Sequence, residues 1–375
     1  MSSEISYIKP PLFTVIVHTY YRPELLREST DAILNQTYDN LEIILIDDGS
    51  TEETKKQLYE YQKKDKRVKL LHFEVNQFRW DDPHRIIDVC FNDALEMSTG
   101  DYIWHQDDDD MLAEDYIEKM VALFQGHPDC ISAAGLPVNM DINGNIRKDE
   151  IFERVSNCRP RYMPGRIIAL QHLGGNRTIF KAPGQIFSFE RKALLKHGGF
   201  HKAYEHHQLY GIVPFGITGF DETAYFYWRR HEGQLNKKLS SQGWIGTKEI
   251  FSMVEDLNIE DKWRVFGVNT AKYVVTQIER NQTRTAAFWF VRNLFNFRLK
   301  GSLSIFRDIW YKPHFWLFIP GIILRRMHII SKIKSMIKSM IKFMIKSMMN
   351  TIDKKFPRLK KRSVLFNKIF LKVNR

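Results

Sequence analysis

Short apolar runs and longer amphipathic segments alternate along residues 1–125. The apolar runs have the length of buried β-strands and lie at Leu12–Val17, Leu41–Ile46, Val68–Phe73 and Gly100–His105. The segments between them repeat their apolar positions with helical spacing, which predicts helices at Pro23–Leu34, Thr51–Lys64 and Arg85–Met97. Strands that alternate with helices of this length predict an α/β fold, with a mostly parallel sheet covered on both faces.

The remainder of the chain divides into three stretches of different character. Residues 126–240 are irregular and rich in glycine, histidine and aromatic side chains, and residues 241–312 have mostly helical spacing. Residues 313–375 contain a near-repeat, Lys-Ser-Met-Ile, that places lysines along one stripe of a helix and Met and Ile on the opposite face. We therefore expect four parts: an α/β half at 1–125, a second half at 126–240, a helical extension and an amphipathic basic tail.

The net charge of +12 belongs to this tail. From Gly321 onward the chain has 16 of its 56 Lys and Arg residues and one acid, Asp353, so residues 1–320 carry 40 basic and 43 acidic side chains. A basic amphipathic helix is typical of segments that lie on an anionic membrane surface, here residues 328–375. The alternative is a helix packed on the protein with solvated lysines. The tail has few aromatic residues and no recognisable nucleic-acid-binding module, so we expect no nucleic-acid partner.

The start of the chain and its cysteines bear on its location. Residues 1–4 lack the basic segment and apolar run of a signal peptide, and no stretch reaches the length of a membrane-spanning helix. The three cysteines, Cys90, Cys130 and Cys158, are too few and too scattered for a disulfide framework or a zinc site. We expect a cytoplasmic protein that its tail holds at the inner face of the cell membrane.

Two acidic clusters follow predicted strands. Asp107–Asp110 comes directly after the strand that begins at Gly100, and Asp47-Asp48 ends the strand from Leu41, before Gly49-Ser50. Parallel sheets bind ligands beyond the carboxyl ends of their strands. Neighbouring carboxylates repel one another unless water or a divalent cation offsets their charge, and Mg²⁺ combines one or two carboxylates with substrate phosphates. The clusters therefore predict a metal-assisted phosphate site, with a solvated turn that caps the following helix as the alternative.

Four motifs occur in order along the chain: Val15–Arg22, Leu34–Tyr38, Ile46–Ser50, and Gly100–Ile103 followed by Asp107–Asp110. In this order they resemble the motifs of family 2 glycosyltransferases, enzymes of the GT-A fold that use nucleotide sugars. The resemblance covers residues 12–235 and implies a nucleotide-sugar-binding half at 1–125 and an acceptor-binding half at 126–240. The Gln-any-any-Arg-Trp motif of processive synthases is absent, which favours the transfer of one or a few sugars.

The resemblance implies a site for a nucleotide-sugar donor, with UDP as the most frequent nucleotide in the family. Thr19 and Tyr20 would contact the nucleotide, although the usual Pro-Thr-Tyr-Asn is replaced here by residues 18–21, His-Thr-Tyr-Tyr. Asp109, together with Asp107, would hold a Mn²⁺ or Mg²⁺ ion as the family's Asp-any-Asp motif. The candidates for contact with the donor are Thr19, Tyr20, Arg22, Asp47, Asp48, Asn92, Asp107, Asp108, Arg230 and His231.

The resemblance also implies a base that accepts a proton from the acceptor. Family members place an acidic pair shortly after a Gly-Gly-Phe turn, which corresponds here to Gly198–Phe200. Glu205 matches the first acid of that pair, His206 stands where the second is expected, and His207 follows. A carboxylate or a neutral imidazole can accept a proton from a hydroxyl, so these three residues are the candidates for the base. The expected attack on the anomeric carbon is in line with the leaving diphosphate and inverts its configuration.

The resemblance and the tail together predict a metal-dependent inverting hexosyl- or N-acetylhexosaminyltransferase. Its acceptor would be a glycan or a lipid-linked hydroxyl in bacterial cell-surface polysaccharide assembly, such as O-antigen, capsule, lipooligosaccharide or teichoic acid. The alternative is an inactive member that binds a nucleotide or glycan as a membrane-recruited partner. A sugar nucleotidyltransferase would need a glycine-rich phosphate loop after the first strand, which His18–Arg22 is not. The sequence leaves the oligomeric state open.

Overall fold

The computed structural model describes residues 9–147, 160–174, 187–235, 239, 247–296, 302–303, 305–306, 310 and 312–327. Nine strands in these residues belong to one sheet. They are β1 (Phe13–Thr19), β2 (Leu41–Asp48), β3 (Val68–Phe73), β4 (Tyr102–Asp107), β5 (Met111–Leu112), β6 (Cys130–Met140), β7 (Tyr162–Pro164), β8 (Phe187–Glu190) and β9 (Ile217–Arg229).

The helices include both regular and irregular turns. The α-helices are α1 (Pro23–Leu34), α2 (Glu52–Lys64), α3 (Asn92–Met97), α4 (Tyr116–Gln125), α5 (Gly165–Leu173), α6 (Arg191–Lys196), α7 (Glu205–His207), α9 (Thr247–Asp256), α10 (Ile259–Trp263), α11 (Val268–Phe295) and α13 (Pro313–Met327). The π-helical turns are η1 (Ile87–Phe91) and η3 (Gln208–Ile212), and the 3₁₀ turns are η4 (Val213–Phe215) and η5 (Arg264–Phe266).

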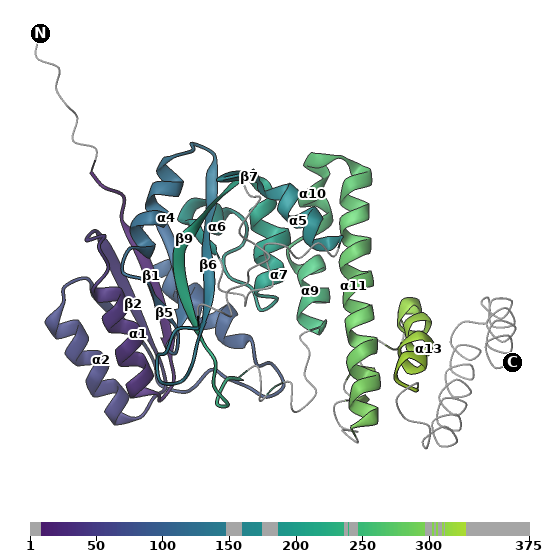
Figure 1. The fold of residues 1–375 in the computed structure, drawn as a ribbon, viewed down its shortest axis with the longest axis horizontal. Helices are drawn as coiled ribbons and strands as arrows, with labels where there is room; N and C mark the ends of the chain where they lie inside the picture. Colours follow the sequence, from purple (N-terminus) through teal and green to yellow (C-terminus); the bar gives the residue numbers. More distant parts are fainter. Residues whose placement is uncertain are drawn as a thin grey trace, which may run out of the picture.

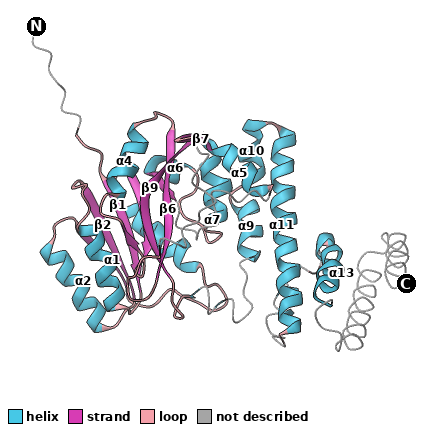
Figure 2. Cartoon of the chain, viewed as in Figure 1, coloured by secondary structure: helices cyan, strands magenta, loops and turns pink. Residues whose placement is uncertain are grey.

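The strand order is β3-β2-β1-β4-β8-β6-β9-β5, with β7 paired to β9. The pairs among β1, β2, β3 and β4 are parallel, as is the β6–β9 pair, whereas β8 runs antiparallel to both β4 and β6. Helices cover both faces of this sheet (Figure 1, Figure 2). The expected α/β fold with a mostly parallel sheet between helices is therefore confirmed.

The alternating side chains of the strands divide the core into two layers. Val15 and Val17 of β1 pack with α1, α2 and α4 on one face, whereas Ile16 packs with α3, α5 and α6 on the other. Both layers consist of buried aliphatic and aromatic residues, which is the pattern that parallel strands covered on both faces require. The apolar runs of the sequence therefore correspond to this double burial.

The predicted elements of residues 1–125 agree with the structure, with small differences at their ends. The first strand is extended to Thr19 and the fourth to Asp107, because pairing with the neighbouring strands continues to these residues. The helix predicted from Arg85 to Met97 forms with the π-helical turn η1 inside it. The strands β6 and β9 lie in a stretch with no predicted regularity, because register shifts in their pairing interrupt the alternation of side chains.

The described helices after residue 247 lie beside the α/β body. Helices α9 and α10 contact it through Ile250, Met253 and Trp263, which join the core layer of β8. Helix α13 packs on α11 through a separate apolar cluster and lies beyond it in Figure 1. None of the described helices combines the length and the apolar character needed to cross a membrane. The predicted amphipathic segment at 328–375 lies outside the described residues.

Candidate active site

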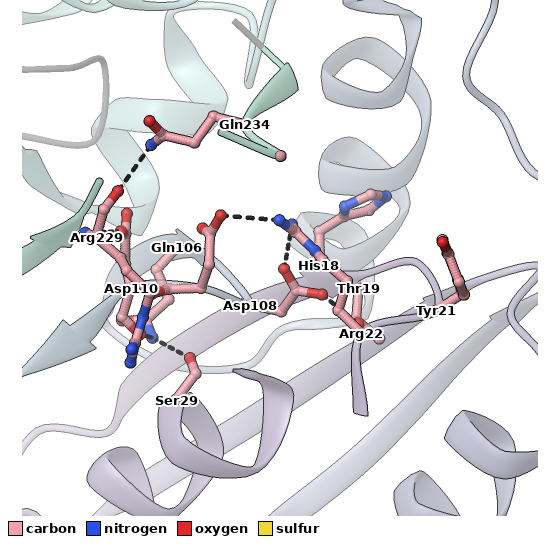
Figure 3. A network of polar contacts seen from close by, with 12 residues as sticks. His18, Thr19, Tyr21, Arg22, Ser29, Gln106, Asp108, Asp110, Arg229 and Gln234 are labelled. Carbon is pink, nitrogen blue, oxygen red and sulfur yellow. Dashed lines mark hydrogen bonds and ion pairs between the residues drawn. The ribbon is translucent and has the colours of Figure 1, made fainter. Parts of the chain in front are cut away.

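The sheet brings the polar clusters together at the carboxyl ends of its parallel strands. Thr19 at the end of β1 is in register with Asp47 of β2, and His18 is in register with Asp107 of β4. Residues that are far apart in the sequence therefore occupy one edge, as expected for a parallel sheet. In Figure 3, Thr19 and Arg22 lie beside Asp108, and Arg229 lies beside Asp110.

The carboxylates of β2 hold the loops around the site. Asp47 accepts hydrogen bonds from the backbone N–H of Ser50 (2.9 Å) and pairs with His72 Nδ1 (2.7 Å). Asp48 is fully buried and contacts His18 Nε2 (3.1 Å), the Asn76 amide (3.0 Å) and the backbone N–H of Gln77 (2.8 Å). Asp47 and Asp48, both candidates for contact with the donor, are thus tied to protein groups on β1, β3 and the loop after β3.

Glycine is required in the turn after Asp48. Gly49 has φ +69°, and a Cβ placed there would lie 2.5 Å from the backbone nitrogen of Asn76. Any side chain would therefore push the loop after β3 away from the sheet edge. The next residue, Ser50, accepts a hydrogen bond from the backbone N–H of Tyr21 (3.2 Å), so this turn also supports the turn after β1.

Arg22 binds the acidic turn. Its guanidinium pairs with Asp108 and donates to Asp109 Oδ2 (2.8 Å), and Thr19 Oγ1 donates to Asp108 Oδ2 (2.5 Å). Burial alone would lower the pKa of Arg22, but the charges of Asp108, Asp109 and Asp107 outweigh burial and raise it above its usual value. Arg22 therefore neutralises part of the charge of the acidic turn.

The four aspartates differ in environment. Asp108, Asp109 and Asp110 are buried, whereas Asp107 reaches the surface. Desolvation and the charge of Asp109 raise the pKa of Asp107 to about 7, and the same causes raise the pKa of Asp110 well above its usual range. Burial also opposes ionisation of Asp109, but contacts with His231 and Arg22 outweigh it and lower its pKa. The turn thus holds the stabilised carboxylate of Asp109 beside Asp107 and Asp110, whose ionisation is opposed.

Three of these aspartates could share a cation. One carboxylate oxygen each of Asp107, Asp109 and Asp110 lies within 4.8 Å of the others. Besides desolvation, the negative charge of Asp109 raises the pKa values of Asp107 and Asp110, and a divalent cation would offset that charge. Oxygen ligands of this kind suit Mg²⁺ and Mn²⁺, so the residues present fit the expected metal.

The end of β9 completes the site. His231 Nε2 lies 2.9 Å from Asp109 Oδ2, which places this predicted donor contact on the acidic turn itself. Arg230 is exposed and its guanidinium stacks over the Trp228 ring at 4.0 Å. These two predicted residues therefore lie at the same strand end, with His231 against the aspartates and Arg230 reaching solvent.

Arg229 is a residue of the site that the sequence analysis did not identify. It is fully buried, its Nε donates to the carbonyl oxygen of Asp109 (2.8 Å), and its guanidinium also bonds Glu28 of α1 and the carbonyl oxygen of Ile142 (2.8 Å). Its backbone N–H donates to Asp110 Oδ1 (2.9 Å). No local signal separates Arg229 from Arg230, because only the tertiary structure decides which of the two arginines points inward.

The sequence analysis also did not identify Arg85 as a residue of the site. Its Nε is buried with no hydrogen-bond partner among the described residues, and its other contact there is a 3.4 Å bond from a terminal nitrogen to the Gln77 side chain. The backbone N–H of Gln77 donates to Asp48, so this guanidinium lies beside the loop that Asp48 holds. A buried N–H without an acceptor is costly, and an acceptor group of a ligand would satisfy it.

The remaining donor candidates occupy different places. Tyr20 is 44% exposed at the rim of the site. Asn92 donates to the carbonyl oxygens of Asp88 (2.8 Å) and Phe200 (2.9 Å) and accepts from the backbone N–H of Phe200 (2.8 Å). Its amide therefore joins α3 to the Gly-Gly-Phe turn, and these bonds to the backbone use most of the hydrogen-bonding capacity that a ligand would need.

The three candidates for the base lie on α7 and differ in access. The Glu205 side chain is 45% exposed and lies 3.9 Å from His206 Nδ1. The Nε2 of His206 contacts the side-chain amide of Gln282 on α11 (3.1 Å). His207 is buried, contacts the carbonyl oxygen of His197 (3.2 Å), and has its pKa lowered to about 3 chiefly by burial. Access to solvent thus separates Glu205 and His206 from His207.

Two solved structures match most of the length of this chain. TarS of S. aureus, in complex with UDP-GlcNAc, is 17% identical, with a TM-score of 0.48 over 83% of this chain and 80% of that chain. The mannosyltransferase PcManGT from Pyrobaculum calidifontis, in complex with GDP-Man and Mn²⁺, is 15% identical, with a TM-score of 0.46 over 87% of this chain and 89% of that one.

Curated relatives match about a third of the chain. An uncharacterized glycosyltransferase of Haemophilus influenzae is 36% identical over 136 residues, which are 36% of this chain and 50% of the relative. The putative teichuronic acid biosynthesis glycosyltransferase TuaG of Bacillus subtilis is 31% identical over 111 residues, 30% of this chain and 41% of the relative. The chain thus spans at most half the length of these relatives.

The match to a family is more extensive than the match to any of these relatives. The family described as Glycosyl transferase family 2 matches residues 14–197, a range that includes most of β1, the two acidic clusters and β8. The motifs at residues 15–22, 46–50 and 107–110 all lie within it. Through residues 14–197, the chain belongs to glycosyl transferase family 2.

Proposed function

We propose that this protein is an inverting glycosyltransferase that moves a sugar from a nucleotide-sugar donor to a hydroxyl group. The observation that carries the proposal is the acidic turn at Asp107–Asp110, where Arg22 and His231 contact Asp109 at the carboxyl edge of the sheet. Family membership supports a transferase, and the edge is where parallel sheets bind ligands. The cluster combines carboxylates with cationic groups, as a site for a metal-bound diphosphate requires.

The donor nucleotide would lie over the ends of β1 and β2. Thr19 and the exposed Tyr20 border this edge, and Asp47 and Asp48 fix the loops around it. Arg85 offers a buried donor without a partner among the described residues, which an acceptor atom of the nucleotide would satisfy. We propose UDP as the nucleotide on the frequency of UDP-sugars in the family.

Asp107 and Asp109 would hold Mn²⁺ or Mg²⁺, with Asp110 close by and His231 in reach of Asp109. When bound, such an ion offsets the negative charge that develops on the leaving diphosphate. The protein's own contribution is to keep Asp109 ionised through Arg22 and His231. Arg230, which reaches solvent beside the turn, would donate to phosphate oxygens with its planar guanidinium.

The acceptor would approach from the side of α7. Glu205 is the more accessible candidate for the base, and His206 lies beside it with its Nε2 toward Gln282. We propose that Glu205 takes the proton from the acceptor hydroxyl, with His206 as its neighbour, because an exposed carboxylate can reach a hydroxyl that a buried His207 cannot. The hydroxyl then attacks the anomeric carbon in line with the leaving nucleotide.

The acceptor is proposed to be a glycan or lipid-linked hydroxyl in cell-surface polysaccharide assembly. The name of the Bacillus subtilis relative refers to teichuronic acid, and it is the basis for proposing a cell-surface polysaccharide as the acceptor class of this chain. The basic composition of 328–375 favours attachment to an anionic membrane. On α13, Leu317 is 57% exposed while Phe315 and Ile319 pack on α11, so this helix also presents an apolar side chain to the outside.

The experiment that tests the function is donor hydrolysis. Purified protein is incubated with UDP-, GDP- and dTDP-sugars and Mn²⁺ or Mg²⁺, and the released nucleoside diphosphate is measured. We expect slow release from one donor, its loss on chelation, and its loss in Asp109→Asn. Tyr162→Phe, which removes a hydrogen bond to Leu123 outside the site, is the control that keeps the activity.

The outcomes separate the proposed function from its alternative. Release that survives both the chelator and Asp109→Asn would contradict the metal site. Tight nucleotide binding with no release, even with candidate acceptors, would favour the inactive nucleotide-binding member. Absence of any nucleotide binding would contradict the assignment of the sheet edge as the donor site.

A further inference from the structure

Tyr204 has a backbone conformation that L-amino acids avoid. Its φ is 49° and its ψ is −114°. Among the described residues, Tyr21 and Asn258 are the other non-glycine residues with positive φ, and Asn258 lies in the ordinary left-handed region with ψ 49°. The combination at Tyr204 is that of the first central residue of a type II′ turn, where glycine is favoured. A tyrosine persists there only if its surroundings hold it.

Contacts at both ends of Tyr204 hold this conformation. The Tyr204 hydroxyl lies 3.1 Å from His105 Nε2, and the two rings meet edge to face with their centroids 5.5 Å apart. The backbone N–H donates to the carbonyl oxygen of His201 (2.7 Å), and the carbonyl oxygen accepts from the backbone N–H of Gln208 (3.1 Å). The side chain is therefore anchored on β4 while the backbone starts α7.

The burial of His105, which anchors Tyr204, costs free energy. It is 1% exposed and packs against Phe91 and Phe200, with ring centroids 5.3 Å and 4.9 Å away. Its Nδ1 is buried with no hydrogen-bond partner among the described residues. Burying an unpartnered ring nitrogen costs free energy that a phenylalanine or leucine would not. The contact of Nε2 with Tyr204 is the interaction that such an apolar residue could not make.

This contact joins the two sides of the candidate site. His105 lies on β4 two residues before Asp107, and Tyr204 directly precedes Glu205. We propose, on the basis of the proposed function, that Tyr204 and His105 are positioning residues. Their hydrogen bond and the strained Tyr204 backbone set the position of Glu205 and His206 relative to the acidic turn. Neither residue needs to touch the donor or the acceptor for this role.

The test compares Tyr204→Phe, His105→Leu and the double variant with the wild-type chain. Donor turnover with Mn²⁺, the KM for the donor, the Mn²⁺ affinity and the free energy of unfolding are measured for each. We expect Tyr204→Phe to lower kcat by roughly tenfold to a hundredfold, with the donor KM and Mn²⁺ affinity unchanged, because a small displacement of a reacting group has this effect. The double variant should lose no more than the single ones, since both remove the same bond.

A matched control separates positioning from general loss of structure. Tyr162→Phe also removes one tyrosine hydroxyl, which donates to the carbonyl oxygen of Leu123 (3.0 Å), and should keep wild-type kcat. Wild-type kcat in Tyr204→Phe would overturn the inference while the proposed function stands, as would a loss that follows the folded fraction or raises the donor KM. A wild-type chain without turnover on any donor or acceptor overturns both, because positioning then has no reaction to serve.

Discussion

Arg229 and Arg230 are neighbours in sequence, and we predict that replacing each by methionine has different consequences. Arg229 is fully buried and binds Glu28, the carbonyl oxygen of Asp109 and that of Ile142. Arg230 is exposed and stacks on Trp228. Methionine keeps much of the unbranched stem of arginine and removes the guanidinium donors, so the two variants differ chiefly in what each guanidinium contacts.

The magnitudes follow from these contacts. Breaking one partner of a buried ion pair costs about 3–5 kcal/mol. The Glu28 side chain is 47% exposed and can turn to water, so we expect Arg229→Met to lose about 2–4 kcal/mol of unfolding free energy. An exposed cation–π contact is worth about 0.5–1 kcal/mol, which sets the upper limit for Arg230→Met.

The two variants should also differ in ligand binding. Arg229 holds the backbone of Asp109 by a hydrogen bond to its carbonyl oxygen. Replacing a residue that holds a metal ligand in this way typically changes metal affinity by about 10- to 100-fold. We therefore expect weaker Mn²⁺ binding in Arg229→Met, and unchanged Mn²⁺ binding with weaker donor binding in Arg230→Met. Urea denaturation gives the stabilities, electron paramagnetic resonance of free Mn²⁺ gives metal affinity, and calorimetry gives donor affinity.

A specific pattern would refute this reasoning. If Arg229→Met unfolds within about 1 kcal/mol of the wild type and binds Mn²⁺ normally, the buried arginine does not support the acidic turn. If Arg230→Met carries the large loss of stability instead, the two side chains have exchanged places. Equal effects in both variants would mean that the charge of the segment, and not the burial of Arg229, determines the outcome.

Three further predictions address other parts of the chain. Burial lowers the pKa of His207 to about 3, and burial together with nearby lysines lowers that of His197 to about 4. Below pH 6.5 the two histidines are therefore protonated in the unfolded state before they are protonated in the native state, which lowers stability. Urea denaturation should show each costing about 2 kcal/mol at pH 5, and a flat profile would contradict their burial. Gly49→Ala should weaken donor binding at least tenfold with Mn²⁺ binding retained, because its Cβ would meet the Asn76 backbone at 2.5 Å; calorimetry giving wild-type affinity would contradict this. Leu317→Asp should reduce co-sedimentation with anionic vesicles while leaving neutral vesicles unaffected, and unchanged binding would exclude α13 from the contact.

Local patterns in the sequence were enough to predict the first half of the fold. The apolar runs at β1, β2 and β3 are continuous because both faces of these strands are buried, and this burial is visible in composition alone. The acidic clusters were predictable for a similar reason, because they directly follow apolar strands whose ends must lie at one edge. Strands β6 and β9 were not predictable, since shifts in their register break the alternation.

Side-chain roles within the site depended on contacts between distant segments. The sequence made His207 a candidate for the base beside Glu205 and His206, but the turn of α7 buries its imidazole against His197. Asn92 is placed near the donor by resemblance, whereas its amide bonds the backbone of Phe200. A pattern along the chain cannot show which way a side chain on a short helix points.

The sequence by itself determined the alternation of strands and helices, the acidic turn after β4 and the membership in a family, because these depend on local spacing and on motifs in order. The tertiary structure decided which carboxylates are neutralised, which arginine is buried, and how Tyr204 meets His105. These pairings join residues 87 apart at Arg22 and Asp109, 99 apart at His105 and Tyr204, and 201 apart at Glu28 and Arg229. Their geometry follows from the order of strands in the sheet, which no local spacing encodes.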